Sequence, residues 1–530
     1  MDSVLSAAAV FSDNMVLQHG KPVPVWGTGF SGDTVRVTWE SGDNCVDTQT
    51  IALGGKWSVK LPPLAAGEKG DLVITDSSSE IRFKNVVTGD VWFAGGQSNM
   101  EMELVNCKNG EMELAACENA DIRFYQVVKR AVVDNDYLRE EAAGRWQICM
   151  PETAALISAA AYFFAKKINH ELKIPVGIIN CSWGGTSISA WMSREYLLRS
   201  RAGERFISDY ADKVGGKSDE QYNTEMEEYN SRWREWDTRI RARREMEPDV
   251  TWETLNRECG QCPWPQPAGN ISPYCPTNLH TARILRAAPF AIKGFIYYQG
   301  EEDDLRAADY REMMYYLVKN WRGDWQDDNL PFLFVQLPMF ASREETDSAA
   351  LNGCDVPRHW CLMRESQYLA SLDIANTGLA VIIDCGEFDN IHPFDKQTVG
   401  FRLALQALKK VYGKNIDADG PVFAWMKIEE NVNSCYAMRL HFDNALCGLE
   451  FRGGVSGSEC YSFEIAAADG PYYPAQTVID GSDVVIRSDS VMRPERARYA
   501  WKKFGPAPLY AKNGLAAMPF RTNRDESADA

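Results

Sequence analysis

The alternation of hydrophobic and polar residues divides the chain into three parts. Its first part, residues 1–89, holds short alternating segments separated by Gly, Pro, Asp and Ser. Alternation with a period of two is typical of strands that bury one face, and these residue types are typical of turns. We therefore expect an all-β module shaped as a small β-sandwich. The strand candidates are residues 23–29, 34–40, 56–64 and 71–76.

From residue 90 the pattern changes to apolar runs that alternate with helical segments. Residues 158–172 follow a helical period, whereas the runs between such segments are almost continuously apolar. Continuous apolar character suits parallel strands that are covered on both faces. The sequence thus predicts an α/β domain over residues 90–412. Its strand candidates are residues 90–97, 176–183, 292–299, 330–338 and 378–385.

A charged segment near residues 203–276 interrupts this domain. It contains a charged helical stretch, residues 220–246, followed by a loop rich in Pro and Cys. This composition favours a solvated inserted helix, and a wall of a substrate cleft is the alternative. Strand-like alternation returns from about residue 413, so a β-rich module with a frayed C-terminal tail is expected over residues 413–530.

Charge and composition make some classes of binding partner unlikely. The chain has 530 residues and a net charge of -18, which disfavours nucleic acid, because clustered Lys and Arg hold a phosphate backbone. No run reaches the roughly 20 apolar residues of a membrane span. The N-terminus lacks a secretion signal, which favours a cytoplasmic location unless a signal was removed. A homo-oligomer is compatible with the sequence.

The cysteines favour free thiols over a disulfide framework. All 14 are scattered through a chain long enough to fold without them, and several lie in apolar runs. Cys259 and Cys262 form the one C-x-x-C pair, but no second pair stands at the spacing of a zinc site. We therefore predict no metal.

Three loops that follow predicted strands carry candidate chemistry. Ser98 lies in GGQSNM, Gly184 and Gly185 lie in SWGGTS, and Gln299 lies in YYQGEEDD. Parallel strands place such loops at one sheet edge, where a serine can act as nucleophile and N–H or amide groups can bind an oxyanion. Ordinary local roles are the alternatives: a helix N-cap for Ser98, a turn for the glycines and a satisfied loop residue for Gln299.

His392 completes the candidate site. It follows a predicted strand, and among the six histidines it alone has a carboxylate, Asp389, three residues before it. A neutral imidazole is the usual base for a serine nucleophile, and a carboxylate within one turn can orient it. A structural histidine is the alternative.

These elements, in this order, resemble the SGNH hydrolase superfamily, and more closely the sialate O-acetylesterase family of carbohydrate esterases. The resemblance covers nearly the whole chain and includes FSDNMVLQHGKPVPVWG, WFAGGQSNME, NCSWGGTSISAWMS, IKGFIYYQGEEDD, DNIHPFDKQTVGFRLAL and LYAKNGLAAMPFRT. It implies a flavodoxin-like parallel sheet in the catalytic domain, flanked by the two β modules. It also implies removal of acetyl groups from O-acetylated carbohydrates, with no cofactor.

The resemblance assigns roles by position. Ser98 would be the nucleophile, His392 the base and Asp389 its partner, although a backbone carbonyl could replace Asp389 because Asn390 stands where an aspartate is frequent. The oxyanion hole would combine the N–H groups of Ser98 and of Gly184 or Gly185 with the Gln299 side chain. The candidate substrate contacts are Gln97, Asn99, Glu301 and Arg364.

The substrate is open at this stage. O-acetylated sialic acid is the leading candidate, and acetylated xylo- or manno-oligosaccharides are the alternative. The block after Gln299 departs from the family pattern, since Glu302 and Asp303 stand where Ser or Asn is usual. A catalytically inactive glycan-binding protein is the competing hypothesis of another class. A lipase is disfavoured, because no serine lies in G-x-S-x-G.

Overall fold

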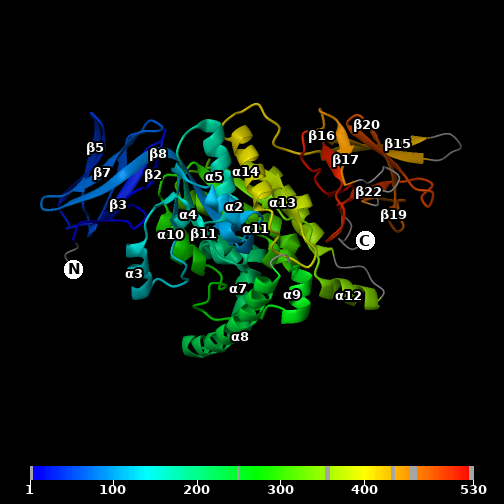
Figure 1. Cartoon of the computed structure of the whole chain (residues 1–530), viewed down its shortest axis with the longest axis horizontal. Helices are drawn as coiled ribbons and strands as arrows, with labels where there is room; N and C mark the ends of the chain where they lie inside the picture. Colours follow the sequence, from blue (N-terminus) through cyan, green and yellow to red (C-terminus); the bar gives the residue numbers. More distant parts are fainter. Residues whose placement is uncertain (1–3, 248–249, 353–357, 431–435, 454–461, 525–530) are drawn as a thin grey trace.

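The computed structural model describes residues 4–247, 250–352, 358–430, 436–453 and 462–524, and it has three parts in a row. A β module at the N-terminal end and another at the C-terminal end lie on opposite sides of a larger α/β body (Figure 1). The predicted α/β class is confirmed. No helix of the described chain is both long enough and apolar enough to cross a membrane.

A parallel sheet forms the centre of the body. Its neighbours run in the order β11-β8-β12-β13-β14, all parallel, with β9 parallel to β11 and β10 antiparallel at the far edge. Apart from β9 and β10, this is the flavodoxin-like order, in which ligands bind beyond the carboxyl ends of the strands where the order reverses, between β8 and β12. The bounds are β8 Glu80–Gly96, β9 Asn119–Gln126, β10 Gln147–Cys149, β11 Val176–Ser182, β12 Gly294–Tyr298, β13 Phe332–Gln336 and β14 Thr377–Val381.

Helices cover both faces of this sheet. Trp92 and Phe93 are neighbours on β8 and therefore point to opposite faces. The Trp92 ring contacts Phe164 of α5, with centroids 5.0 Å apart, and the Phe93 ring contacts Trp321 of α11, at 5.5 Å. α14 packs on α5, and α13 packs on α11. The bounds are α5 Ala159–Leu172, α11 Ala307–Asp324, α13 His359–Asp373 and α14 Lys396–Lys410.

The N-terminal module is joined to the body through β8. This strand of 17 residues pairs with β7 in its first half and with β11 and β12 in its second. The predicted boundary between residues 89 and 90 thus falls inside one strand, and a single hydrophobic core continues from the module into the body. The other strands are β1 Ser6–Ala7, β2 Val16–Gln18, β3 Val23–Thr28, β4 Thr34–Ser41, β5 Asn44–Ile51, β6 Lys56–Leu61 and β7 Lys69–Thr75.

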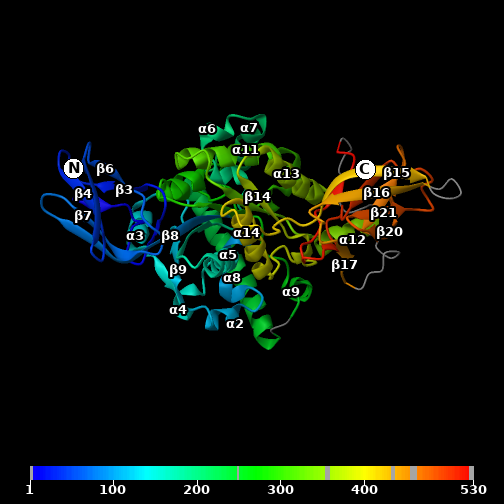
Figure 2. The same ribbon diagram turned by 90° about the horizontal axis from the view of Figure 1, so that it is seen from above.

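The charged insertion is helical, as predicted. Its longest helix, α8, has 28 residues and projects from the body (Figures 1 and 2). Only Tyr222, Tyr229, Trp236 and Ile240 of α8 are buried, so most of its surface is solvated. Its helices are α7 Arg201–Val214, α8 Asp219–Met246 and α9 Trp252–Cys259. Elsewhere the body has α1 Ser98–Glu101, α2 Gly110–Ala115, α3 Asn135–Ala143, α4 Pro151–Ala154, α6 Arg194–Leu197, α10 Leu285–Ala287 and α12 Arg343–Asn352.

The C-terminal module has its own hydrophobic core. One sheet has the order β15-β16-β21-β20, a second has the order β19-β18-β22-β24, and β17 pairs with β23. Leu440 and Val484 of the first sheet share a buried cluster with Phe463 and Tyr499 of the second. Residues 525–530 of the predicted tail lie outside the described residues. The bounds are β15 Val422–Glu430, β16 Tyr436–Asp443, β17 Leu449–Phe451, β18 Phe463–Ala466, β19 Tyr473–Pro474, β20 Gln476–Asp480, β21 Asp483–Arg487, β22 Arg496–Tyr499, β23 Leu509–Ala511 and β24 Phe520–Arg521.

Candidate active site

Ser98 and His392 meet at the carboxyl edge of the sheet. Ser98 is the first residue of α1, directly after β8, and His392 lies in the loop between β14 and α14. The Ser98 Oγ and His392 Nε2 are 2.8 Å apart, within hydrogen-bond distance. Gln97, not Ser98, is the N-cap residue of α1, so the N-cap interpretation of Ser98 is wrong. Residues 294 positions apart thus share one proton.

The sharp turn before Ser98 requires glycine. Gly96 has a φ of 139°, a region that L side chains rarely adopt. A Cβ atom there would also lie 2.1 Å from the Tyr298 carbonyl oxygen of the neighbouring strand. The chain can therefore leave the sheet at this point and present Ser98 only because residue 96 has no side chain.

The surroundings keep the His392 imidazole neutral. Burial, and then the positive charge of Lys396, lower the pKa of His392 to about 4. His392 as a residue keeps partial solvent exposure. A neutral imidazole at neutral pH can accept the Ser98 proton, as a general base must.

The structure does not pair Asp389 with His392, contrary to the prediction. The Asp389 Oδ1 accepts the Arg343 N–H at 2.9 Å, and Oδ2 accepts from the Asn256 side chain at 3.3 Å. Among the hydrogen bonds of the described residues, none joins the two side chains and none reaches His392 Nδ1. Asp389 has a φ of 55°, so local spacing did not fix the direction of its carboxylate.

Asn390 holds the histidine loop instead. Its Oδ1 accepts the His392 backbone N–H at 3.0 Å, and its Nδ2 donates to Glu387 at 2.7 Å. Glu387 also accepts the Phe394 N–H. The imidazole is thus positioned through its backbone on one side and through Ser98 on the other.

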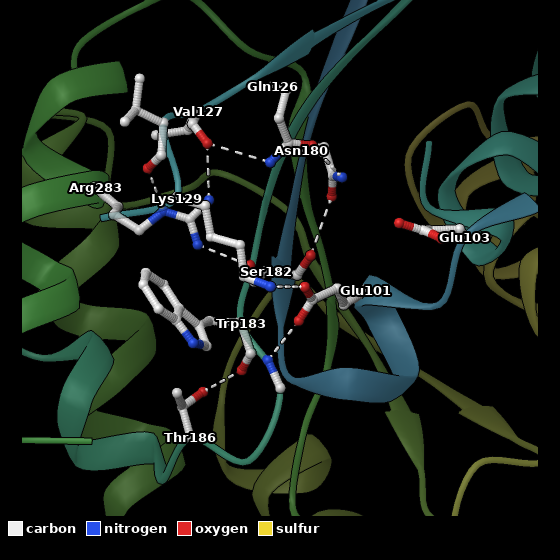
Figure 3. Close-up of polar contacts among 12 residues, drawn as sticks. Glu101, Glu103, Gln126, Val127, Lys129, Asn180, Ser182, Trp183, Thr186 and Arg283 are labelled. Atoms are coloured by element: carbon white, nitrogen blue, oxygen red, sulfur yellow. Dashed lines mark hydrogen bonds and ion pairs between the residues drawn. The ribbon is translucent and has the colours of Figure 1, made fainter. Parts of the chain in front are cut away.

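Of the two candidate oxyanion glycines, Gly185 keeps its donor available. The Gly184 N–H donates to the Glu101 carboxylate at 2.5 Å, and Lys129 binds the other oxygen of Glu101 (Figure 3). No hydrogen bond in the described part of the chain uses the N–H of Gly185 or of Ser98. Both groups are therefore available as donors near Ser98, and sequence reasoning did not separate Gly185 from Gly184.

Arg283 fixes the strand that carries these glycines. Its guanidinium is fully buried and donates to the carbonyls of Ser182, Val127 and Val128 at 2.7 to 3.0 Å (Figure 3). The end of β11 is therefore tied to the segment after β9. The sequence held no signal for Arg283, because its partners are backbone atoms more than 100 residues away.

Gln299 does not occupy the oxyanion hole, contrary to the prediction. Its Nε2 donates to Asp303 at 2.6 Å and to the Thr186 carbonyl at 3.2 Å, and its Oε1 accepts from Tyr310 at 2.7 Å. The side chain is 1% exposed. With its amide hydrogens engaged inside the protein, Gln299 stabilises the loops beneath the site.

The predicted contacts Gln97, Asn99 and Glu301 are also buried. The Gln97 Oε1 accepts the N–H groups of Gly300 and Glu302 at 3.3 Å. The Asn99 Nδ2 donates to Glu301 at 2.5 Å and to the Ile391 carbonyl at 2.9 Å. They join the loop after β12 to α1 and the histidine loop.

Lys396 is a buried cation that sequence reasoning missed. Its ammonium donates to Asn99 Oδ1 at 2.6 Å and to the Pro393 carbonyl at 2.7 Å. Burial lowers the pKa of Lys396 to about 8 and raises that of Glu301 to about 7. Five buried polar residues lie behind Ser98, and we call them the buried polar layer: Gln97, Asn99, Gln299, Glu301 and Lys396.

Arg364 lies outside the site. It is 1% exposed and donates to the Lys502 carbonyl at 2.6 Å, which links α13 to the C-terminal module. Both the predicted sugar contact and its alternative, an exposed helical arginine, are therefore wrong. Within the described residues no group of three His, Cys, Asp or Glu side chains could hold a metal ion.

Comparison with known proteins identifies the family. The model of the family described as "carbohydrate esterase, sialic acid-specific acetylesterase" matches residues 88–250 and 270–381, more than half of the chain. The chain belongs to this family. The matched residues contain Ser98, both glycines and Gln299, so the family region includes the nucleophile and the loops beside it, while His392 lies after it.

Individual relatives of the family agree. The chain is 27% identical to the sialate O-acetylesterase of Mus musculus over 459 residues, 78% of this chain and 75% of the relative. The Homo sapiens sialate O-acetylesterase is 27% identical over 448 residues, 78% and 73% of the two chains. A crystal structure of a carbohydrate acetylesterase from Xanthomonas citri is 30% identical, with a TM-score of 0.74, and covers 98% of this chain and 100% of that one.

Proposed function

We propose that the chain hydrolyses acetyl esters of carbohydrates, with Ser98 as nucleophile and His392 as base. The contact of 2.8 Å between Ser98 Oγ and His392 Nε2 carries the proposal. The available N–H groups of Ser98 and Gly185 support it, since an acyl transfer needs donors for the tetrahedral oxyanion. Membership of an acetylesterase family indicates that the acyl group is acetyl. This reactive pair argues against a purely glycan-binding protein.

The mechanism follows from these positions. His392 takes the Ser98 proton while Oγ attacks the acetyl carbonyl, and the N–H groups of Ser98 and Gly185 donate to the oxyanion. The imidazolium then returns the proton to the departing sugar oxygen. Water attacks the acetyl-serine with His392 again as base, and acetate leaves. Among the described residues no carboxylate binds the His392 ring, so the imidazolium forms against burial and the Lys396 charge, the two causes that lower the pKa of His392.

For the substrate we propose O-acetylated sialic acid first and acetylated xylo- or manno-oligosaccharides second. The family description and the mammalian relatives support the former. The Xanthomonas citri relative, at 30% identity, is described only as a carbohydrate acetylesterase. The second class of substrate is therefore tested as well.

An acetate-release assay tests the function. Purified protein is incubated with a mono-O-acetylated sialic acid, an acetylated xylo-oligosaccharide and p-nitrophenyl acetate. Ser98→Ala and His392→Ala should each lower kcat by several orders of magnitude on every ester that the wild type cleaves. Failure of the wild type to release acetate from either sugar, or full activity of Ser98→Ala, would contradict the proposal.

We further propose that the β modules, residues 1–89 and 413–530, are sandwich-like units around an SGNH catalytic domain, residues 90–412. Shared burial of both C-terminal sheets in one cluster supports a sandwich at that end. Limited proteolysis checks the division: cleavage near residue 413 is expected to release a protease-resistant C-terminal fragment. The link through β8 should protect the N-terminal boundary.

A further inference from the structure

A pocket of about 430 Å³ lies beside the catalytic serine. Gly185 and Glu302 line it on the catalytic side, and each adjoins the centre: a Cβ on Gly184 would lie 3.2 Å from the Ser98 Cβ, and Glu301 binds Asn99. The opposite walls come from α7 and from the loop after α9, so they belong to the insertion. We call it the insertion pocket. Its volume falls within the range of small-ligand sites.

Trp264 is the largest side chain of this pocket. It lies in the loop after α9 and is 46% exposed, although the same side chain packs against the catalytic loop. A Cβ on Gly185 would lie 2.2 Å from the Trp264 ring, so the indole fits only against a glycine. Tyr274 holds the ring edge-on, with centroids 5.5 Å apart. The indole is thus fixed in place, while Trp264 lines the pocket and stays 46% exposed.

Polar groups surround this aromatic surface. The Arg306 guanidinium pairs with Asp209, and Tyr210 donates to the Gly269 carbonyl at 3.1 Å. Glu302 and Lys213 line the pocket, and no ion pair of the described chain includes either of them. A fixed apolar ring beside polar side chains with unused hydrogen-bonding capacity matches a ligand with an apolar face and many hydroxyls, which describes a pyranose ring.

We propose that the insertion pocket binds the sugar whose acetyl ester Ser98 attacks, and that the sugar ring stacks on Trp264. The inference rests on the proposed function and assigns its sugar subsite. The Gly185 N–H would bind the acetyl carbonyl oxygen, and Gly185 also lines the pocket, so an ester placed at Ser98 lies against the pocket wall. The insertion would then supply the recognition that distinguishes a sugar ester from a small ester.

The test compares two tryptophans of equal exposure. Trp264→Ala is measured beside Trp425→Ala, because Trp425 on β15 is 47% exposed and belongs to the C-terminal module. The readout is kcat/KM for the O-acetylated sialic acid, and for the acetylated xylo-oligosaccharide, each divided by kcat/KM for p-nitrophenyl acetate. A ratio cancels any general loss caused by a shift of the Gly185 loop.

We expect Trp264→Ala to lower this ratio about tenfold for each sugar that the wild type cleaves, through loss of stacking. Trp264→Phe should restore most of the ratio, and Trp425→Ala should keep it within about twofold. An unchanged ratio in Trp264→Ala, or an equal fall in Trp425→Ala, would overturn the subsite. A wild type that cleaves p-nitrophenyl acetate but neither sugar ester would instead overturn the proposed function.

A second measurement covers a poorly folded variant. Free N-acetylneuraminic acid and free xylotriose are tested as inhibitors of p-nitrophenyl acetate hydrolysis by the wild type and by Trp264→Phe. We expect the free form of each sugar whose ester is cleaved to inhibit p-nitrophenyl acetate hydrolysis by the wild type. The inhibition constant should be similar in Trp264→Phe. Absence of inhibition by both sugars at concentrations above the KM of their esters would contradict a sugar subsite.

Discussion

The two sides of Ser98 differ in kind. Behind it, the buried polar layer binds almost all its donors and acceptors within the protein. In front, the insertion pocket leaves Glu302 and Lys213 without ion pairs to any described residue, and Trp264 is 46% exposed. The layer comes from the family motifs, whereas the outer wall of the pocket comes from the insertion, for which the sequence favoured a solvated helix and left a cleft wall as the alternative. Motif residues thus hold the catalytic loops together, and recognition falls to the insertion.

The largest effect is expected at Asn99, whose substitution tests whether the buried polar layer holds the catalytic loops together. Its amide joins Glu301, Ile391 and Lys396, so Asn99→Ala leaves a buried ammonium and a buried carboxyl short of a partner. We expect a loss of about 3 to 5 kcal/mol in the free energy of unfolding, with a lower kcat because the histidine loop loses its tether. Urea unfolding and p-nitrophenyl acetate turnover measure both.

Asn106→Ala is the matched control for that variant. Asn106 is exposed and donates only to Glu103, at 2.8 Å, so its loss should change the unfolding free energy by less than about 0.5 kcal/mol. Equal stability of the two variants would mean that the buried polar layer does not hold the loops.

A variant of Gln299 decides between two roles, because the resemblance implies an oxyanion donor and the geometry indicates a structural residue. Gln299→Met keeps the volume but leaves Asp303 and Tyr310 without their amide partner. We expect the free energy of unfolding to fall by about 2 to 3 kcal/mol, with kcat falling less than the hundredfold typical of a lost oxyanion donor. A hundredfold loss of kcat at unchanged stability would return Gln299 to the oxyanion hole.

The sequence predicted the frame of the site well, for local reasons. The apolar runs became β8, β11, β12, β13 and β14, and Ser98, Gly185 and His392 reached one edge because parallel strands end together. What failed depended on partners distant in sequence. Asp389 binds Asn256 and Arg343, and Arg364 binds Lys502. Neither local spacing nor helical period contains that information.

The pH profile tests how Lys396 of the buried polar layer affects the His392 base. Only the neutral imidazole can accept the Ser98 proton, so activity is lost as pH falls through the pKa of His392, which burial and Lys396 lower to about 4. We expect kcat/KM to stay level from neutral pH down to about pH 5. Lys396→Met removes a positive charge and should move the acid limb to higher pH. A wild-type limb near the ordinary histidine value would contradict this environment.

The smallest expected effect lies at the rim of the insertion pocket. Lys213 is exposed, and Glu302 is the nearby acid whose pKa burial and Asp303 raise to about 8. Glu302 has an exposed surface as well, so solvent screens both groups and each is worth little. Lys213→Gln should lower kcat/KM for the anionic sialic acid ester by about two- to fivefold and leave the neutral xylo-oligosaccharide unchanged.

The difference should shrink at high salt, because added ions screen the attraction between exposed charges. Lys319→Gln, an exposed lysine on α11 outside the pocket, is the control and should affect neither substrate. An equal fall on both substrates would mean that Lys213 supports the fold of the pocket and does not read the charge of the sugar. Selectivity between the two sugars would then have to come from hydroxyl contacts at Glu302, and Glu302→Gln would be the variant that changes it.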